Sequence, residues 1–218
     1  MDVSEGITVI NAHGFEDTDT TQKLWAINDA IWEIDGMEPW PYLYKTVNLN
    51  FDGTNPYPSN LPTDLQKVKW LTRLSDGEPI WPERIETIRS RYGATSVIGQ
   101  QGQPQSFYFV GQQLRFWPVP PAGTGAVLLD YRAVQAKVTD TTLEAAILMP
   151  ARFHSAWVFG ALKRLYDADD DPEQGAVKKA DMEERVMKMR AELFPQQEMR
   201  SDVVVLTDPE EIDPYMYS

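Results

Sequence analysis

The sequence contains no cysteine, and histidine is nearly as scarce. The missing cysteine excludes disulfide bonds, thiolate nucleophiles and cysteine-ligated metal centres. The only histidines are His13 and His154, which lie in different segments. His154 is followed by Ser155 on an expected helix, where adjacent side chains point apart and do not form a nucleophile–base pair. Because no catalytic constellation can be assembled, we do not expect an enzyme.

The chain also lacks a long hydrophobic run. No apolar stretch approaches the roughly 20 residues that are needed to span a bilayer. The acidic start has neither the basic end nor the apolar centre of a signal peptide. We therefore expect a soluble protein that is synthesised inside the cell and has no membrane partner.

Basic residues are also fewer than acidic ones. Twenty Lys and Arg stand against 33 Asp and Glu, which gives a formal net charge of −13. Proteins that bind nucleic acid tightly use clustered cations to neutralise phosphates, so this composition argues against such binding. An acidic surface still allows DNA to pass close by without being adsorbed.

Two short motifs resemble ligand sites but do not match them fully. Residues 167–173 place acids at alternating positions, as a calcium loop between two helices does. However, Pro172 stands where that loop needs glycine, and Lys178 stands where its closing carboxylate belongs. The glycine-containing stretch 93–105 lacks the Lys and Ser or Thr of a phosphate-binding loop. We therefore expect no metal and no cofactor.

The periodicity of the apolar residues predicts an α+β fold in a chain of 218 residues. Helical spacing predicts helices over residues 20–36, 82–92, 150–170 and 172–194, and the last two are close enough to form an antiparallel hairpin. The predicted architecture is a bundle of about four helices with an inserted antiparallel β-sheet or hairpin arm and an extended C-terminal arm.

The helical stripes define an expected core. Trp25 and Trp32 flank the stripe of the first helix, and we expect them to pack in the core or between parts of the fold. The last helix is expected to bury Val177 and Met189 along its stripe. The other expected core residues are Leu24, Ile27, Ile31, Phe153, Trp157, Leu165, Val186 and Leu193.

Strand parity predicts strands near residues 43–51 and 65–73, before the aromatic stretch 107–133. In that stretch we expect a hairpin that turns at Gly111, and a third strand over 126–134 that completes a β-arm at about 105–135. Most of its rings are expected to rest on the helices. The expected contact residues of the arm are Phe109, Arg115, Trp117 and Tyr131.

These elements divide the chain into an N-terminal segment (1–17), a single α+β domain (18–195) and an acidic C-terminal arm (196–218). The C-terminal arm is expected to be extended, and the alternative is a disordered acidic tail.

The order of these parts resembles the head-to-tail adaptor (connector) proteins of tailed bacteriophages. The resemblance covers roughly residues 20–195. It is carried by a Leu-Pro-acid segment, by a Gly-x-x-Leu-Arg hairpin that is followed by prolines, and by a late helical pair. In this sequence these are Leu61-Pro62-Thr63-Asp64, Gly111 with Leu114-Arg115 and Pro118-Val119-Pro120, and residues 150–193.

The resemblance implies a structural virion protein at the head–tail junction, synthesised in the host cytoplasm. It implies a ring of identical subunits, commonly about twelve, which binds the portal protein and a tail, nozzle or tail-completion protein. Double-stranded DNA would pass through the channel without specific binding. The C-terminal arm would reach the portal or a neighbouring subunit, and its implied contact residues are Val203, Val204, Val205, Leu206, Ile212, Tyr215, Met216 and Tyr217. The alternative is a carbohydrate- or peptide-binding module with a groove near Tyr108, Trp117 and Tyr131.

Overall fold

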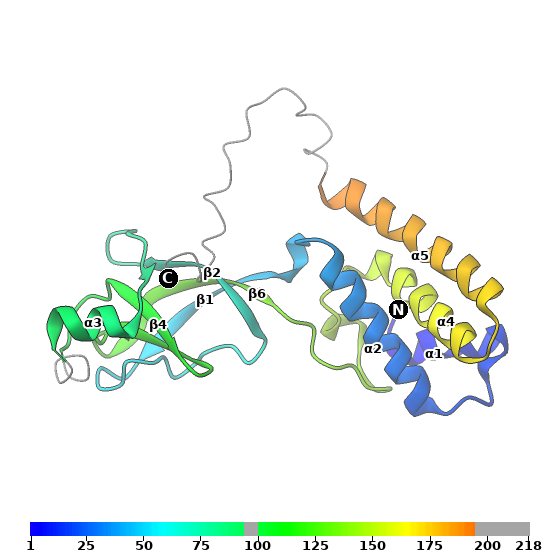
Figure 1. Cartoon of the computed structure of the whole chain (residues 1–218), viewed down its shortest axis with the longest axis horizontal. Coiled ribbons are helices and arrows are strands. Elements are labelled where there is room, and N and C mark those ends of the chain that lie inside the picture. The colour runs from blue at the N-terminus through cyan, green and yellow to red at the C-terminus, as the bar shows by residue number, and fades with distance from the viewer. Residues whose placement is uncertain (94–99, 195–218) are drawn as a thin grey trace, which may run out of the picture.

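The computed structural model describes residues 1–93 and 100–194, which form two lobes of an elongated molecule (Figure 1). One lobe is helical and contains α1 (Val3–Ile10), α2 (Thr20–Met37), α4 (Ser155–Ala168) and α5 (Pro172–Leu193). The other lobe contains every strand that the structure describes and is inserted between α2 and α4. The predicted α+β architecture, a bundle of about four helices with an inserted β region, is therefore confirmed.

An aspartate caps the N-terminus of three of the four helices in the helical lobe. Asp2 accepts a hydrogen bond from the Glu5 amide in a capping box at α1, and Asp19 accepts one from Thr21 at α2. Asp171 caps α5, where Pro172 occupies the first helical position. Such caps accept hydrogen bonds from amides that have no partner within the helix. The negative charge of the aspartate is also attracted by the partial positive charge at the N-terminus of the helix.

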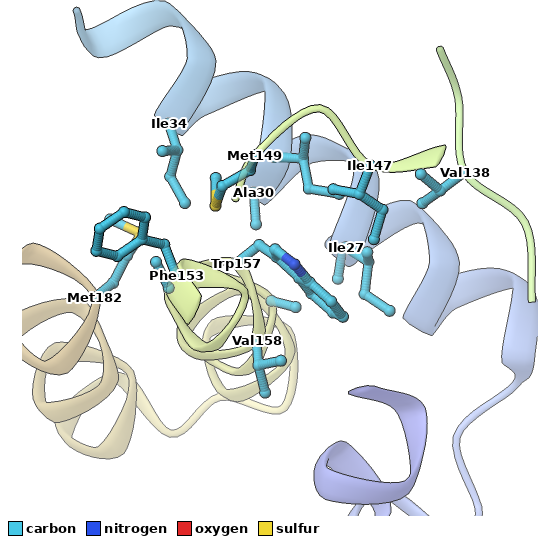
Figure 2. Close-up of a cluster of buried hydrophobic side chains, with 14 of the residues drawn as sticks. Ile27, Ala30, Ile34, Val138, Ile147, Met149, Phe153, Trp157, Val158 and Met182 are labelled. Carbon is cyan, nitrogen blue, oxygen red and sulfur yellow. The ribbon is translucent and has the colours of Figure 1, made fainter. Parts of the chain in front are cut away.

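The core of the helical lobe is assembled around Trp157. Figure 2 shows this ring at the centre, close to Ile27 and Ala30 of α2 and to Ile147 and Met149 from the segment before α4. Trp157 is completely buried, and so are the two α2 side chains. Burying large apolar side chains of this kind contributes about 1.5–3 kcal/mol each.

The N-terminal segment takes part in the same core. Val3 and Ile10 of α1 are fully buried in the cluster that contains Trp157. Gly6 lets α1 approach closely, since a Cβ atom at this position would lie only 2.2 Å from Cη2 of Trp157. The fourth helix of the bundle is therefore α1. The predicted short helix became α3 (Ile85–Tyr92), which belongs to the β lobe, where Ile88 packs against Tyr108 and Trp117.

Along α5, the predicted stripe is wrong at Val177, which is half exposed. The buried residues are Gly175, Met182 and Met189, which are seven residues apart. Val177 lies five residues before Met182 and so points about 140° away around the helix.

The two tryptophans of α2 also differ from expectation. Trp25 is 60% exposed, and Trp32 is largely exposed although its indole nitrogen donates to the main-chain oxygen of Gln135. The α2 core is instead filled by smaller side chains. Of the remaining expected core residues, Ile27, Ile31, Phe153, Trp157 and Leu165 are buried, and Leu24, Val186 and Leu193 are half-buried against the same cluster.

The β lobe contains two three-stranded sheets. In the first, β6 (Gly123–Ala133) lies between β1 (Tyr44–Phe51) and β2 (Leu65–Arg73) and is antiparallel to both. In the second, β4 (Ser106–Val110) lies between β3 (Trp81–Pro82) and β5 (Gln113–Trp117). The predicted strands near 43–51 and 65–73 and the predicted hairpin are confirmed. The hairpin turns at Gly111, whose φ of 60° favours glycine.

The predicted third strand of the aromatic arm pairs elsewhere. Residues 126–133 belong to β6. This strand pairs with β1 and β2 and not with the β4–β5 hairpin. The inner faces of the two sheets meet in a second core, where Phe51 and Phe116 contact edge to face with ring centres 5.2 Å apart. The aromatic side chains of the hairpin therefore pack against the first sheet, and the expectation that they rest on the helices is wrong.

Within the described residues, the chain passes between the lobes through residues 38–43 and 134–138 (Figure 1). At this junction Arg132 of β6 donates through Nη2 to the main-chain oxygen of Asp35 at 2.6 Å. The Tyr42 hydroxyl donates to Oδ1 of Asp35 at 2.8 Å. The end of α2 is thereby tied to the start of β1 and to β6.

Candidate interaction surfaces

Both histidines have structural positions. His154 is buried, and its ring nitrogens lie 2.7 Å from the main-chain oxygen of Met1 and 2.8 Å from that of Met149. His13 makes a 2.9 Å hydrogen bond to the main-chain oxygen of Val9, one turn earlier. The His154 contacts tie the N-terminus to the segment before α4.

The acidic turn between α4 and α5 is explained by local contacts. Asp171 caps α5 and Asp167 forms a 2.8 Å ion pair with Lys163. Across the described ranges, 1–93 and 100–194, no three His, Asp or Glu side chains gather in a group that could hold a metal ion.

Charge is distributed unevenly between the lobes. The β lobe (residues 44–134) has nine Lys and Arg against seven Asp and Glu, whereas the helical lobe (1–43 and 135–194) has ten against twenty. One basic side chain of the helical lobe, Arg164, is engaged by both Asp29 and Glu33. The two lobes therefore present surfaces of different charge to their surroundings.

The β lobe has an exposed apolar surface formed by Trp70 and Trp81, which we call the tryptophan patch. Trp70 is 42% exposed and Trp81 is 52% exposed, and the two rings meet edge to face with centres 5.6 Å apart. Exposed aromatic clusters of this kind are typical of protein–protein contacts.

Of the four expected contact residues of the arm, Phe109 and Arg115 reach the surface. Phe109 is 50% exposed at the end of β4, and the half-buried Arg115 donates to the exposed side chain of Gln113. Trp117 is buried and stacks on Tyr92, with ring centres 3.9 Å apart. Tyr131 is buried as well, so these two side chains pack within the lobe.

Asp64, the acid of the Leu-Pro-acid segment, organises one end of the first sheet. Its carboxylate pairs with Lys45 at 2.7 Å and accepts a hydrogen bond from the Tyr131 hydroxyl at 3.0 Å. Burial acts to raise the pKa of Asp64, but the hydrogen bonds from Lys45 and Tyr131 outweigh it and the pKa is lowered. Burial and the Asp64 hydrogen bond raise the pKa of Tyr131 to about 12. The motif therefore ties β1 to β6.

A shallow pocket of about 370 Å³ lies beside the tryptophan patch. Trp81, Tyr92 and Trp117 supply its rings, and Glu83 and Arg91 form a 3.2 Å ion pair at its edge. Within the described part of the chain, the Ser106 hydroxyl and the Trp117 indole nitrogen are buried there without a hydrogen-bond partner. Its volume lies within the range of small-molecule sites.

Comparison with protein families identifies the chain. A family model described as SU10 adaptor protein matches residues 2–206. The chain belongs to the SU10 adaptor protein family. The match confirms the resemblance to phage head-to-tail adaptors. It includes the N-terminal segment, which was outside the resemblance, and residues 203–206 of the C-terminal arm. A comparison with curated proteins finds no match.

For this phage adaptor, the relevant sites are surfaces. The sequence analysis did not predict the tryptophan patch. Trp70 and Leu71 are neighbours in β2 and point to opposite faces of the sheet, and both are apolar, so the sequence does not show which of the two faces is buried. None of the helices among the described residues is long and apolar enough to cross a membrane. The predicted contact residues of the adaptor's C-terminal arm, from Val203 to Tyr217, lie outside the described residues.

Proposed function

We propose that this adaptor forms a ring of identical subunits, about twelve, beneath the portal and joins the capsid to the tail. The ring surrounds the channel through which double-stranded DNA passes without specific binding. Its partners are the portal protein above and a tail, nozzle or tail-completion protein below. It acts at the head–tail junction of the virion as a structural protein and catalyses no reaction.

The match to an adaptor family over residues 2–206 carries this proposal. The surfaces are consistent with it, because the tryptophan patch and Phe109 offer apolar contact area on the inserted lobe. The acidic excess of the helical lobe favours sliding of DNA over adsorption wherever that lobe faces the channel.

We further propose that the C-terminal arm binds the portal or a neighbouring subunit. Residues 203–206 would add a strand to an exposed sheet edge. Ile212, Tyr215, Met216 and Tyr217 would anchor the rest of the arm.

Deletion of residues 200–218 tests the proposal. The truncated chain should keep the unfolding midpoint of the full chain but should no longer co-purify with the phage's own portal protein. A control deletion of residues 210–218 keeps the 203–206 run and should retain part of the binding. Undiminished portal binding by the chain that lacks 200–218 would contradict the role given to the arm.

The alternative of a carbohydrate- or peptide-binding module has one observation in its favour, the aromatic pocket beside Trp81. A module of that kind would remain monomeric in the presence of the portal and would bind a glycan or peptide. Trp81→Ala would then abolish ligand binding, and deletion of 200–218 would leave it intact.

A further inference from the structure

The end of α5 lies at the junction of the two lobes. Phe194 packs against Trp40 with ring centres 5.7 Å apart, and Arg190 pairs with Glu38 at 3.4 Å. Both partners belong to the segment 38–43, which leads into β1. Figure 1 shows the C-terminal end of α5 on the side that faces the β lobe. The chain therefore enters its C-terminal arm (196–218) from the lobe junction.

Net charge favours contact between this arm and the β lobe. The arm contains six Asp and Glu against a single Arg. Of the two lobes, only the β lobe has more Lys and Arg than Asp and Glu, nine against seven, whereas the helical lobe has ten against twenty. Opposite charge therefore attracts the arm to the β lobe, and like charge repels it from the helical lobe.

Two exposed lysines of β2 lie close to the junction. Lys69 lies over the ring of Tyr44, the first residue of β1, with Nζ 4.3 Å from the ring centre. Lys67 is opposite Arg132 in the pairing of β2 with β6, and Arg132 in turn bonds to Asp35 at the end of α2. Among the residues that the structure describes, Lys69 has no acidic partner. An acidic segment that leaves the junction along β2 therefore meets cations first.

The tryptophan patch follows the lysines along the same strand. Trp70 comes directly after Lys69, and its exposed ring meets the exposed ring of Trp81. The arm has a matching order, with its acidic run at 208–213 and a Tyr-Met-Tyr at 215–217. Tyrosine rings and methionine sulfur both pack favourably against aromatic side chains.

The arm is long enough to follow this path. Its 23 residues span up to about 80 Å when extended. A tether of this length holds the acidic run at a local concentration of about 1 mM around its own β lobe. In a dilute solution the arm therefore meets its own lobe far more often than that of a second copy.

We propose that the C-terminal arm folds back on its own β lobe in the free chain, before the portal is bound. The acidic run 208–213 lies against Lys67 and Lys69, and residues 215–217 cover the tryptophan patch. The contact keeps an apolar surface covered until assembly. Release of the arm by the portal rests on the proposed function, whereas the contact in the free chain does not.

The first experiment measures the contact in the full-length chain without the portal. The native sequence has no cysteine, so Ser218→Cys provides a single attachment site for a nitroxide spin label. The label should broaden the indole N–H signals of Trp70 and Trp81 in the NMR spectrum. We expect a loss of about half of their intensity or more, because the tether keeps the arm at a high local concentration. The indole signal of Trp25, which is exposed on α2, should keep its intensity.

A mixed sample separates the chain's own arm from that of a second copy. Isotope-labelled native chain is mixed with spin-labelled chain that carries no isotope, so that only contacts between molecules are detected. The signals of the tryptophan patch should then keep their intensity. Broadening as strong as in the single-chain sample would contradict the assignment to the chain's own arm.

Charge reversal tests how the arm is recognised. Lys67→Glu/Lys69→Glu should restore the two patch signals of the spin-labelled chain. Lys179→Glu/Lys188→Glu is the matched control, since it makes the same change of charge at exposed positions of α5, and it should leave the broadening intact. Raising the salt concentration to about 1 M should also reduce the broadening, because charges are then screened within about 3 Å.

Two further outcomes would overturn the proposal. If the patch signals keep their intensity, or if all indole signals broaden alike, the arm makes no specific contact with the β lobe. If broadening persists unchanged in Lys67→Glu/Lys69→Glu, the lysines do not recognise the acidic run. Because the portal is absent from every sample, these results are independent of whether the arm binds the portal.

Discussion

Asp35 occupies an unusual place for a carboxylate, buried at the lobe junction with one oxygen bonded to Tyr42. Burial raises its pKa to about 6 from the ordinary 3.8, against the opposing effects of Tyr42 and Arg132. The folded state therefore holds the proton more tightly than the unfolded chain does. As the pH rises from about 4 to about 6, the folded protein loses up to about 3 kcal/mol of stability, and the loss remains at higher pH.

Asp35→Asn should for this reason stabilise the protein at pH 8, by about 1–3 kcal/mol. Asn keeps the shape of the side chain and removes the buried charge. The gain should disappear near pH 4, where Asp35 is protonated in the folded protein. Urea unfolding at both pH values measures the difference, with the exposed Asp17→Asn as control. A gain of the same size at both pH values would contradict the explanation by burial.

Trp157 and Trp25 allow a comparison of the same residue type in a buried and in an exposed environment. Trp157 is completely buried and Trp25 is 60% exposed. Trp157→Ala should destabilise the fold by about 3–5 kcal/mol, because it removes a large buried side chain and leaves a cavity. Trp25→Ala should change the free energy of unfolding by about 0.5 kcal/mol or less. A loss below about 1 kcal/mol for Trp157→Ala would contradict the core assignment.

At the scale of elements, the position of α1 depends on one close contact. A Cβ atom at Gly6 would lie 2.2 Å from the Trp157 ring, whereas one at Gly36 in α2 would meet no atom within 4 Å. Gly6→Ala should therefore destabilise the protein by about 1–3 kcal/mol through overpacking. Gly36→Ala should be neutral or stabilise it by up to about 1 kcal/mol, because alanine favours helix.

Thermal unfolding of the two alanine variants side by side checks this expectation. Hydrogen exchange at Val3 and Ile10 should rise in Gly6→Ala and stay unchanged in Gly36→Ala. If both variants behaved alike, the contact between α1 and Trp157 would not be what holds α1 in place.

A helix or strand was predictable where the spacing of its own apolar residues identified it. α2, α4, the β4–β5 hairpin and the strand at 65–73 follow from apolar spacing and turn residues, and the structure has them. Pairing between distant strands was not predictable. The alternation Val127, Leu129, Tyr131 identifies a strand with one apolar face, but it gives no information on which neighbour that strand joins. The paired residues of β2 and β6 are at least 54 residues apart in the sequence.

The candidate surfaces were harder to predict than the core. An aromatic residue in a strand is equally compatible with a buried and an exposed face, so Trp117 and Tyr131 were expected at contacts and are buried. Trp70 and Trp81 are exposed, and their rings meet only because the chain turns back after β2. Asp64 was recognised only as part of a motif, and its contacts with Lys45 and Tyr131 required the fold.

At the scale of the whole molecule, the two lobes differ in charge and in exposed apolar surface. The tryptophan patch lies on the β lobe, and the acidic excess is concentrated in the helical lobe. If the patch is an assembly surface, the double variant Trp70→Ala/Trp81→Ala should fold normally and lose most of its self-association in the presence of the portal. Sedimentation velocity measures this, with Trp25→Ala as the control, because it removes an exposed tryptophan that lies outside the patch. Full assembly by the double variant would exclude the patch from the contact.

The central claim is that this chain acts as a component of a closed assembly on the portal. Negative-stain imaging of the adaptor co-purified with its portal protein tests this claim most directly. The account predicts an additional ring of density on one face of the portal, coaxial with its channel and absent when the adaptor is omitted. A portal without added density, beside an adaptor that sediments as a monomer at the same concentrations, would contradict it.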